Sequence, residues 1–262
     1  MAKKLIIANW KMSPADKETA KKFFISAQKN SRNLKNVDVV VCPPFVYLGV
    51  FPPSVQGGPR THGQITLGAQ DIFWDEKKTS YTGEVSATML KKLGVKYVII
   101  GHSERREYLG EDNLIVNKKV KYALLAGLKV VLCVGEKKRD EDGEYFNFIK
   151  TEIQEGLKSV PNKLVNNLIV AYEPIWAIGK SGKNADSPEK VFEISIYIKK
   201  VLVGIFGRQK GENIPILYGG SVDTKNTKGF LSLGGVVGLL VGHKSLEPEA
   251  FKEIVEIANS IK

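Results

Sequence analysis

The sequence predicts an α/β fold, a single (β/α)₈ barrel with parallel strands that takes up residues 1–262. The main observation is that eight short runs rich in β-branched residues alternate with helical stretches. These runs lie at residues 4–8, 37–42, 64–69, 95–100, 129–134, 168–172, 214–218 and 236–241. Several of them are continuously apolar, which is typical of parallel strands buried on both faces. An open, doubly wound sheet is the alternative architecture.

Signals for helix ends fall between these runs. Ser13-Pro14 predicts the start of a helix that continues to about residue 30, and Ser187-Pro188 predicts another. Each pair offers an N-cap oxygen followed by proline at the first helical position. Apolar residues at helical spacing predict a helix over 114–125, with Gly127 ending it. No linker divides the chain, and a single barrel commonly has this length of 262 residues.

The composition is that of a globular protein. Apolar residues make up 43% of the chain and charged residues 26%, which argues against intrinsic disorder. No apolar run approaches the ~18 residues that span a bilayer, so we expect a cytoplasmic protein without a membrane partner. Cys42 and Cys133 both lie in β-like apolar runs, where a buried thiol is the expected state rather than a disulfide or a metal ligand.

The chain is strongly basic, with 39 Lys and Arg against 28 Asp and Glu and a net charge of +11. The basic residues are spread along the chain in short groups such as Lys21-Lys22, Lys118-Lys119 and Lys199-Lys200. A nucleic-acid surface would require a basic block with interleaved aromatic residues. We therefore interpret the charge as solvated helix faces and expect no nucleic-acid partner.

In a barrel of this kind the chemistry lies at the carboxyl ends of the strands. Asn9 and Lys11 follow the first run, and His102 follows the fourth at the start of a helical stretch. The positive end of a helix dipole favours a neutral imidazole, which can donate a hydrogen bond to a carbonyl oxygen. Glu173 follows the sixth run and precedes Pro174 and large apolar groups, surroundings that suit a carboxylate to act as a general base.

Glycine-rich turns follow the seventh and eighth runs, at 219–221 and 242–245. We expect each turn to open a helix and to offer backbone N–H groups to a phosphate. The stretch 174–183 contains Gly179 and Gly182 and indicates a long, flexible lid. Taken together, these residues predict a proton-transfer site for a small phosphorylated carbonyl compound.

At these residues the sequence resembles the triosephosphate isomerases, from Ala8 almost to the C-terminus. The motifs that carry the resemblance are Asn9-Trp10-Lys11-Met12, Gly101-His102-Ser103-Glu104-Arg105-Arg106, Cys133-Val134-Gly135-Glu136, the run 171–179 around Glu173, and Tyr218-Gly219-Gly220-Ser221. The resemblance implies a TIM barrel, a homodimer, and interconversion of dihydroxyacetone phosphate and D-glyceraldehyde 3-phosphate through an enediolate in glycolysis and gluconeogenesis. It also implies that no cofactor or metal takes part.

The resemblance assigns roles to the catalytic candidates. Glu173 is the base that moves the proton and His102 is the neutral electrophile, an assignment that belongs to this family and is carried over with it. Lys11 places positive charge near the substrate oxygens, and Asn9 assists by hydrogen bonding. Glu104 resembles the family's second carboxylate, which orients Lys11; a direct part in proton transfer is the alternative role.

Further roles concern the phosphate, the lid and the dimer. The implied substrate-binding residues are Asn9, Lys11, Gly179, Ser221, Gly242 and His243. The lid comprises 174–185; Glu136 with Trp176 holds it open, and Tyr218 with Ser221 latches it closed. The loop 71–84 resembles the segment that inserts into a partner subunit, where Thr82 would reach Asn9 and Lys11 of the partner subunit.

The sequence departs from the family pattern at a few positions. His243 stands where the family usually has a second glycine, so a bulky side chain and a possible extra positive charge lie near the phosphate. The lid carries one extra residue within 179–183, and another precedes Ser187. Val237 stands where the family often has Asp.

Two other functions would account for part of these features. A barrel that acts on a different phosphorylated metabolite would share the phosphate turns but would not require Glu173, His102 and Lys11 together. A nucleic-acid-binding barrel with vestigial site residues would use the +11 charge. The complete set of site residues favours the isomerase.

Overall fold

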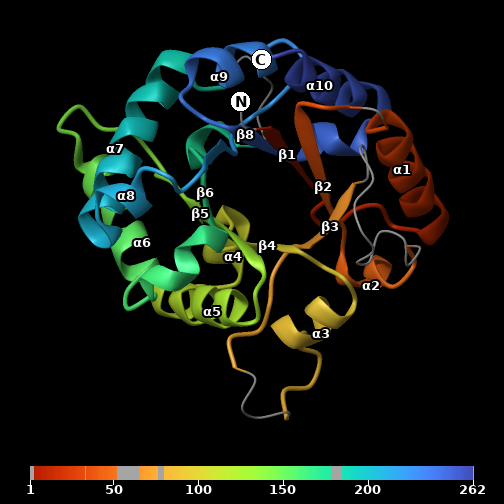
Figure 1. Cartoon of the computed structure of the whole chain (residues 1–262), viewed down its shortest axis with the longest axis horizontal. Coiled ribbons are helices and arrows are strands. Elements are labelled where there is room, and N and C mark those ends of the chain that lie inside the picture. Colours follow the sequence, from red (N-terminus) through yellow and green to blue (C-terminus); the bar gives the residue numbers. More distant parts are fainter. Residues whose placement is uncertain (1–2, 33, 52–64, 76–79, 179–184, 262) are drawn as a thin grey trace.

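The computed structural model describes residues 3–32, 34–51, 65–75, 80–178 and 185–261. Its strands form one closed barrel in chain order, and every neighbouring pair is parallel (Figure 1). The strands are β1 Lys4–Asn9, β2 Val37–Cys42, β3 Thr66–Ala69, β4 Tyr97–Ile100, β5 Lys129–Val134, β6 Leu168–Tyr172, β7 Ile216–Tyr218 and β8 Gly238–Val241. The predicted (β/α)₈ barrel is therefore confirmed, and the alternative prediction of an open, doubly wound sheet is wrong.

Helices surround the barrel in Figure 1. The α-helices are α1 Lys17–Asn30, α2 Phe45–Leu48, α3 Ala87–Lys92, α4 Ser103–Tyr108, α5 Asn113–Leu125, α6 Glu144–Gly156, α7 Pro188–Phe206, α8 Arg208–Gly211, α9 Thr227–Leu233 and α10 Pro248–Ser260. Short 3₁₀ helices are η2 Asn162–Asn167, η3 Ile175–Ala177 and η5 His243–Leu246. Between β3 and α3, the described parts of the connecting segment extend away from the barrel (Figure 1).

The strand side chains fill two separate layers. Ile7 of β1 belongs to the cluster inside the barrel, whereas its neighbours Ile6 and Ala8 belong to the cluster between the sheet and the helices. This follows from the period-2 alternation of side chains along a strand. Inside the barrel, Gly68 of β3 leaves space for Cys42, since a Cβ at Gly68 would lie 2.4 Å from the Cys42 Sγ. Both cysteines are buried free thiols, as predicted.

The helix-end predictions are confirmed in two cases and wrong in one. Helix α7 begins at Pro188 with Ser187 as its N-cap, and Gly127 follows α5 with a φ of 75°. Helix α1, however, begins at Lys17 and not after Ser13. The physical reason is that the Asp16 carboxylate accepts hydrogen bonds from the Thr19 N–H (2.8 Å) and hydroxyl (2.7 Å), so Asp16 is the stronger cap.

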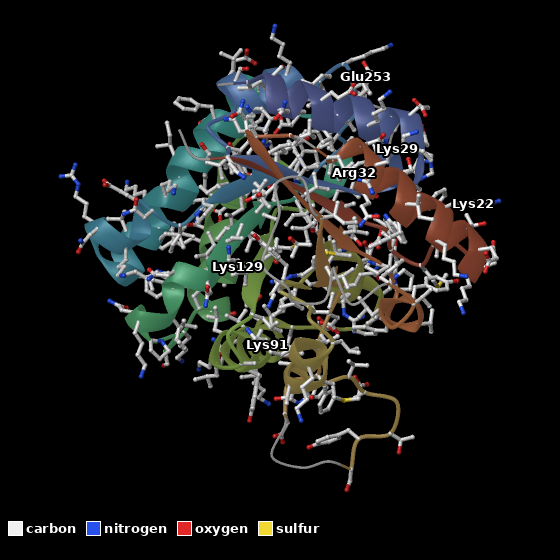
Figure 2. The ribbon with its side chains drawn as sticks, turned by 45° about the vertical axis from the view of Figure 1, so that its right-hand side comes forward. Lys22, Lys29, Arg32, Lys91, Lys129 and Glu253 are labelled. Carbon is white, nitrogen blue, oxygen red and sulfur yellow. The ribbon has the colours of Figure 1, made fainter. Side chains whose placement is uncertain are left out.

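Basic side chains are distributed over different elements. Lys22 and Lys29 project from α1, Lys91 lies on α3 and Lys129 begins β5, and each of these residues is exposed (Figure 2). This distribution agrees with solvated faces. Within the described ranges, no helix combines the length and apolarity needed to cross a membrane.

Candidate active site

A cavity of about 490 Å³ opens at the carboxyl ends of the strands. Seven of the predicted site residues line it: Asn9, Lys11, His102, Glu173, Ser221, Gly242 and His243. They follow β1, β4, β6, β7 and β8, so their proximity results from closure of the barrel. Gly179, also predicted to bind substrate, lies outside the described residues.

His102 lies at the start of α4, at the wall of the cleft. It is the N-cap of α4, and its Nδ1 accepts a hydrogen bond from the Glu104 N–H at 3.2 Å. An imidazole whose Nδ1 accepts must carry its proton on Nε2. That Nε2 lies 3.4 Å from the Glu173 Oε1. The residue thus presents an N–H donor beside a carboxylate, as the helix-start argument predicts.

Glu173 is a buried carboxylate with one oxygen uncommitted. Its residue exposure is 1%, and its Oε2 accepts a hydrogen bond from the Ser103 N–H at 3.1 Å. Its Oε1 makes no hydrogen bond within the described part of the chain. A Cβ at Gly219 would lie 2.9 Å from the Glu173 Cγ, so the glycine after β7 makes room for the carboxylate. An unsatisfied buried oxygen is costly, which points to a functional role.

Lys11 is oriented by both its backbone and its side chain. Its φ of 53° lies in the left-handed region, and its N–H donates to the Asn9 Oδ1 at 3.1 Å. Strain of this kind in a residue other than glycine is typical of functional sites. The Lys11 Nζ forms a short hydrogen bond to the Glu104 Oε1, so Glu104 contacts Lys11 although it does not line the cleft.

The glycine turns line the cleft beside the catalytic candidates. Gly219, Gly220, Ser221, Gly242 and His243 all border it, and a Cβ at Gly242 would lie 3.3 Å from the Lys11 Cε. After β8 the chain enters η5, but after β7 the helix α9 begins only at Thr227, so the prediction that both turns open a helix is wrong for the first. The Asn226 and Asp223 side chains form a capped turn that intervenes. His243 keeps a negative φ, and its side chain is 86% exposed.

A polar cluster joins the two ends of the predicted lid. The Glu136 Oε1 accepts from the Tyr172 hydroxyl and from the Trp176 Nε1, both at 2.9 Å. Arg139 donates to the Tyr172 hydroxyl at 2.9 Å and also pairs with Asp186. Local sequence patterns do not single out Arg139 or Asp186 as site residues. Arg139 belongs to a basic run that is typical of a solvated helix face. The one sequence signal for a functional role is its position shortly after the fifth strand.

Ser221 and Tyr218, predicted to latch the lid, and Thr82, predicted to contact a partner subunit, lie in described segments. The Ser221 hydroxyl donates to the Ala177 carbonyl at 2.6 Å, and the Tyr218 hydroxyl accepts from the Asp186 N–H at 3.4 Å. Thr82 lies exposed in the segment between β3 and α3, away from the cleft residues of its own chain.

A closed parallel barrel that brings a buried carboxylate, a neutral imidazole and an ammonium group to one cleft with glycine turns defines an intramolecular isomerase of the proton-transfer type. Known proteins agree with this class. The family model described as triosephosphate isomerase matches residues 4–258. The chain belongs to the triosephosphate isomerase family.

Individual relatives are similar over almost their whole length. The triosephosphate isomerase of Caldanaerobacter subterraneus subsp. tengcongensis is 41% identical, covering 97% of this chain and 99% of its own. That of Dictyoglomus turgidum is 40% identical, also over 97% of this chain and 99% of its own. That of Fusobacterium nucleatum is 40% identical over 99% of this chain and all of its own.

Proposed function

We propose that this chain interconverts dihydroxyacetone phosphate and D-glyceraldehyde 3-phosphate in the cytoplasm, as an enzyme of glycolysis and gluconeogenesis, and that it acts as one barrel domain. Membership of the triosephosphate isomerase family supports the reaction. The observation that carries the assignment of residues is the 3.4 Å separation of the Glu173 Oε1 and the His102 Nε2 at the wall of the cleft.

The proposed chemistry moves one proton at a time. Glu173 takes a proton from the carbon next to the substrate carbonyl, while the N–H of His102 donates to the carbonyl oxygen. Lys11 stabilises the negative charge that develops on the oxygens, and Asn9 adds a hydrogen bond. The proton of the substrate hydroxyl passes to the former carbonyl oxygen through the His102 imidazole, and Glu173 returns its proton to the neighbouring carbon, so that the former hydroxyl carbon becomes the carbonyl. Since hydrogen only changes place within one molecule, the reaction has no net oxidation and calls for no redox cofactor; His102 and Lys11 supply the polarisation of the carbonyl that a metal ion could otherwise give.

The phosphate is assigned to the glycine turns. Ser221, Gly242 and His243 line the cleft, where their N–H groups would bind the phosphate, and a backbone N–H survives the change from glycine to histidine at 243. Gly179 would add its N–H from the lid. The overall charge of +11 would help to attract a dianionic substrate.

A coupled assay tests the proposal. Glyceraldehyde 3-phosphate is supplied, and NADH oxidation by glycerol-phosphate dehydrogenase reports dihydroxyacetone phosphate. The wild-type chain is expected to be active, and Glu173→Gln is expected to lose at least about 10³-fold in kcat because it has no base. Absence of wild-type turnover above background would contradict the proposed reaction.

We also propose that the chain forms a homodimer through the carboxyl ends of its first four strands. Exposed apolar side chains occur on the segments that follow β1, β2 and β4, which are neighbours in the barrel with β3: Met12, Phe45, Val46, Tyr108 and Leu109. The segment after β3, which carries Thr82, lies between them in barrel order. Exposed apolar side chains on neighbouring segments are typical of a subunit interface, and in it Thr82 would reach Asn9 and Lys11 of the partner subunit.

A further inference from the structure

A second buried carboxylate lies behind the catalytic glutamate, outside the substrate cleft. Glu152 belongs to α6 and is only 4% exposed. Glu152, Arg106, Cys133 and Glu173 border one packing gap that is too small for a water molecule. The mechanism above uses neither Glu152 nor Arg106, yet burying charged groups is costly unless they are paired.

Glu152 supports the backbone on which Glu173 rests. The Glu152 Oε2 accepts a hydrogen bond from the Gly135 N–H at 2.8 Å. On either side of Gly135, the Val134 carbonyl accepts from the Glu173 N–H at 2.8 Å and the Glu136 carbonyl accepts from the Ile175 N–H at 3.0 Å. A Cβ at Gly135 would lie 1.8 Å from the Glu173 carbonyl oxygen, so the two backbones are in direct contact. A shift of Gly135 would therefore move Glu173.

Glu152 also belongs to a charge cluster that includes Glu173. The Arg106 Nη1 lies 3.5 Å from the Glu152 Oε1. Arg106 also donates hydrogen bonds to the Gly101 carbonyl and to the Asn113 side chain. Its Nη2 has no hydrogen-bond partner among the described residues. The Arg106 guanidinium thus pairs with Glu152 and borders the same gap as Glu173. Besides Arg106 and Glu173, the charged or titratable groups around Glu152 are Glu107, Asp112, Cys133, Glu136 and Lys137.

The pKa of Glu152 is raised to near neutral pH. Burial raises the pKa of Glu152 to about 7, although Arg106 and the Gly135 N–H act in the opposite direction. The charge of Glu173 contributes to the increase. The interaction between two charges is mutual, so the charge of Glu152 also acts on Glu173.

We propose that Glu152 is a positioning residue for Glu173. Its carboxylate holds the Gly135 backbone against that of Glu173, and its charge, in the same buried cluster as Arg106, acts on the base. This inference rests on the proposed function, since it requires Glu173 to be the base. Glu152 acts only through Gly135 and through the field at Glu173, because it does not line the substrate cleft.

Two substitutions separate the two parts of this role. Glu152→Gln keeps an oxygen that can accept from the Gly135 N–H but removes the charge. In the wild type, kcat is expected to rise through an inflection near pH 7 as Glu152 ionises, and in Glu152→Gln that inflection should be absent while kcat at pH 5.5 stays within about twofold. The substrate phosphate titrates near pH 6 in both proteins, so the difference between their profiles isolates Glu152.

Glu152→Leu removes both the charge and the acceptor. It leaves the Gly135 N–H without a partner, and we expect kcat to fall about tenfold with little change in KM, because the base is displaced while the phosphate turns are untouched. Because glutamine keeps the acceptor, Glu152→Gln should retain most of the kcat that Glu152→Leu loses. Glu144→Gln provides the matched control: it removes the same charge from an exposed position of the same helix and should leave kcat and its pH profile unchanged.

The possible outcomes are distinct. Superimposable kcat profiles of active wild-type and Glu152→Gln enzymes would overturn the charge role, and an unchanged kcat in a folded Glu152→Leu would overturn the backbone role. An inactive wild type would instead contradict the proposed function. Circular dichroism of each variant separates loss of folding from loss of position.

Discussion

At the scale of single residues, the site depends on charges held in fixed positions by the backbone. The Lys11 ammonium is fixed by its left-handed backbone, by Asn9 and by Glu104. Such preorganisation stabilises transition-state charge because the groups need not reorient during the reaction.

Lys11→Met tests this charge. The variant keeps a side chain of similar length but has no cation, and we expect kcat/KM to fall by about 10²–10³-fold, or about 3–4 kcal/mol of transition-state stabilisation. The fold should remain, so thermal unfolding should change little. Lys22→Met, at an exposed position of α1, is the control (Figure 2). Near-native turnover of Lys11→Met would contradict the assigned role.

The raised pKa of Glu152 also predicts how stability depends on pH. Its value in the folded protein, about 7, lies above the ordinary 4.5, so the folded protein binds this proton more tightly than the unfolded chain does. The associated stability is complete below pH 4.5 and is lost as pH rises through 7. The Glu152→Gln side chain does not titrate, so the variant does not lose this stability as pH rises. The free energy of unfolding of the wild type minus that of the variant should therefore decrease by about 3 kcal/mol between pH 4.5 and 8.

Urea unfolding of both proteins at several pH values measures this difference. The control Glu144→Gln should show no comparable trend, because its carboxylate is exposed. A difference between wild type and Glu152→Gln that does not vary with pH would contradict the shift.

At the scale of elements, caps decide where helices begin after the strand ends. Asp16 rather than Ser13 starts α1, and Ser187 starts α7 immediately after the lid. The cap matters because the first N–H groups of a helix have no partner within it.

Ser187→Ala should therefore destabilise the protein. The Ser187 hydroxyl accepts from the Lys190 N–H at 3.3 Å, and its loss should lower the free energy of unfolding by about 1 kcal/mol. Ser187→Asp keeps an acceptor and should restore stability. Thermal denaturation at one fixed protein concentration measures both, and equal melting temperatures for wild type and Ser187→Ala would show that this cap contributes nothing.

At the scale of the whole molecule, the proposed dimer would bury the apolar side chains on the segments after β1, β2 and β4. Met12 is 97% exposed in the single chain although it follows Lys11 directly. Burial of such side chains is the main favourable contribution to association.

Met12→Lys should weaken the dimer, because it places a charge in an apolar interface. Sedimentation is expected to show a lower mass at micromolar concentration, together with lower kcat as Lys11 loses its supporting contacts. Ile25→Lys makes the same change at an exposed position of α1, away from this face, and should leave the mass unchanged. A wild type that sediments as a monomer would contradict the dimer.

Much of the fold and the site could be predicted from local patterns. The eight apolar runs correspond to the eight strands, and the residues expected at their ends do line one cleft, because parallel strands in a closed barrel share a carboxyl end. The start of α1 was misplaced because Ser13-Pro14 and Asp16 both have capping chemistry, and the choice depends on which side chain reaches the N–H groups.

By itself, the sequence determined the order of strands and helices, the family, and which residues stand at the strand ends, since each of these depends on neighbours along the chain. Only the tertiary structure decided that the Ser103 N–H holds Glu173, that Arg139 joins Tyr172 to Asp186, and that Glu152 lies behind the base. Those contacts join segments far apart in the chain. Their geometry follows from the closure and register of the barrel, which local periodicity does not specify.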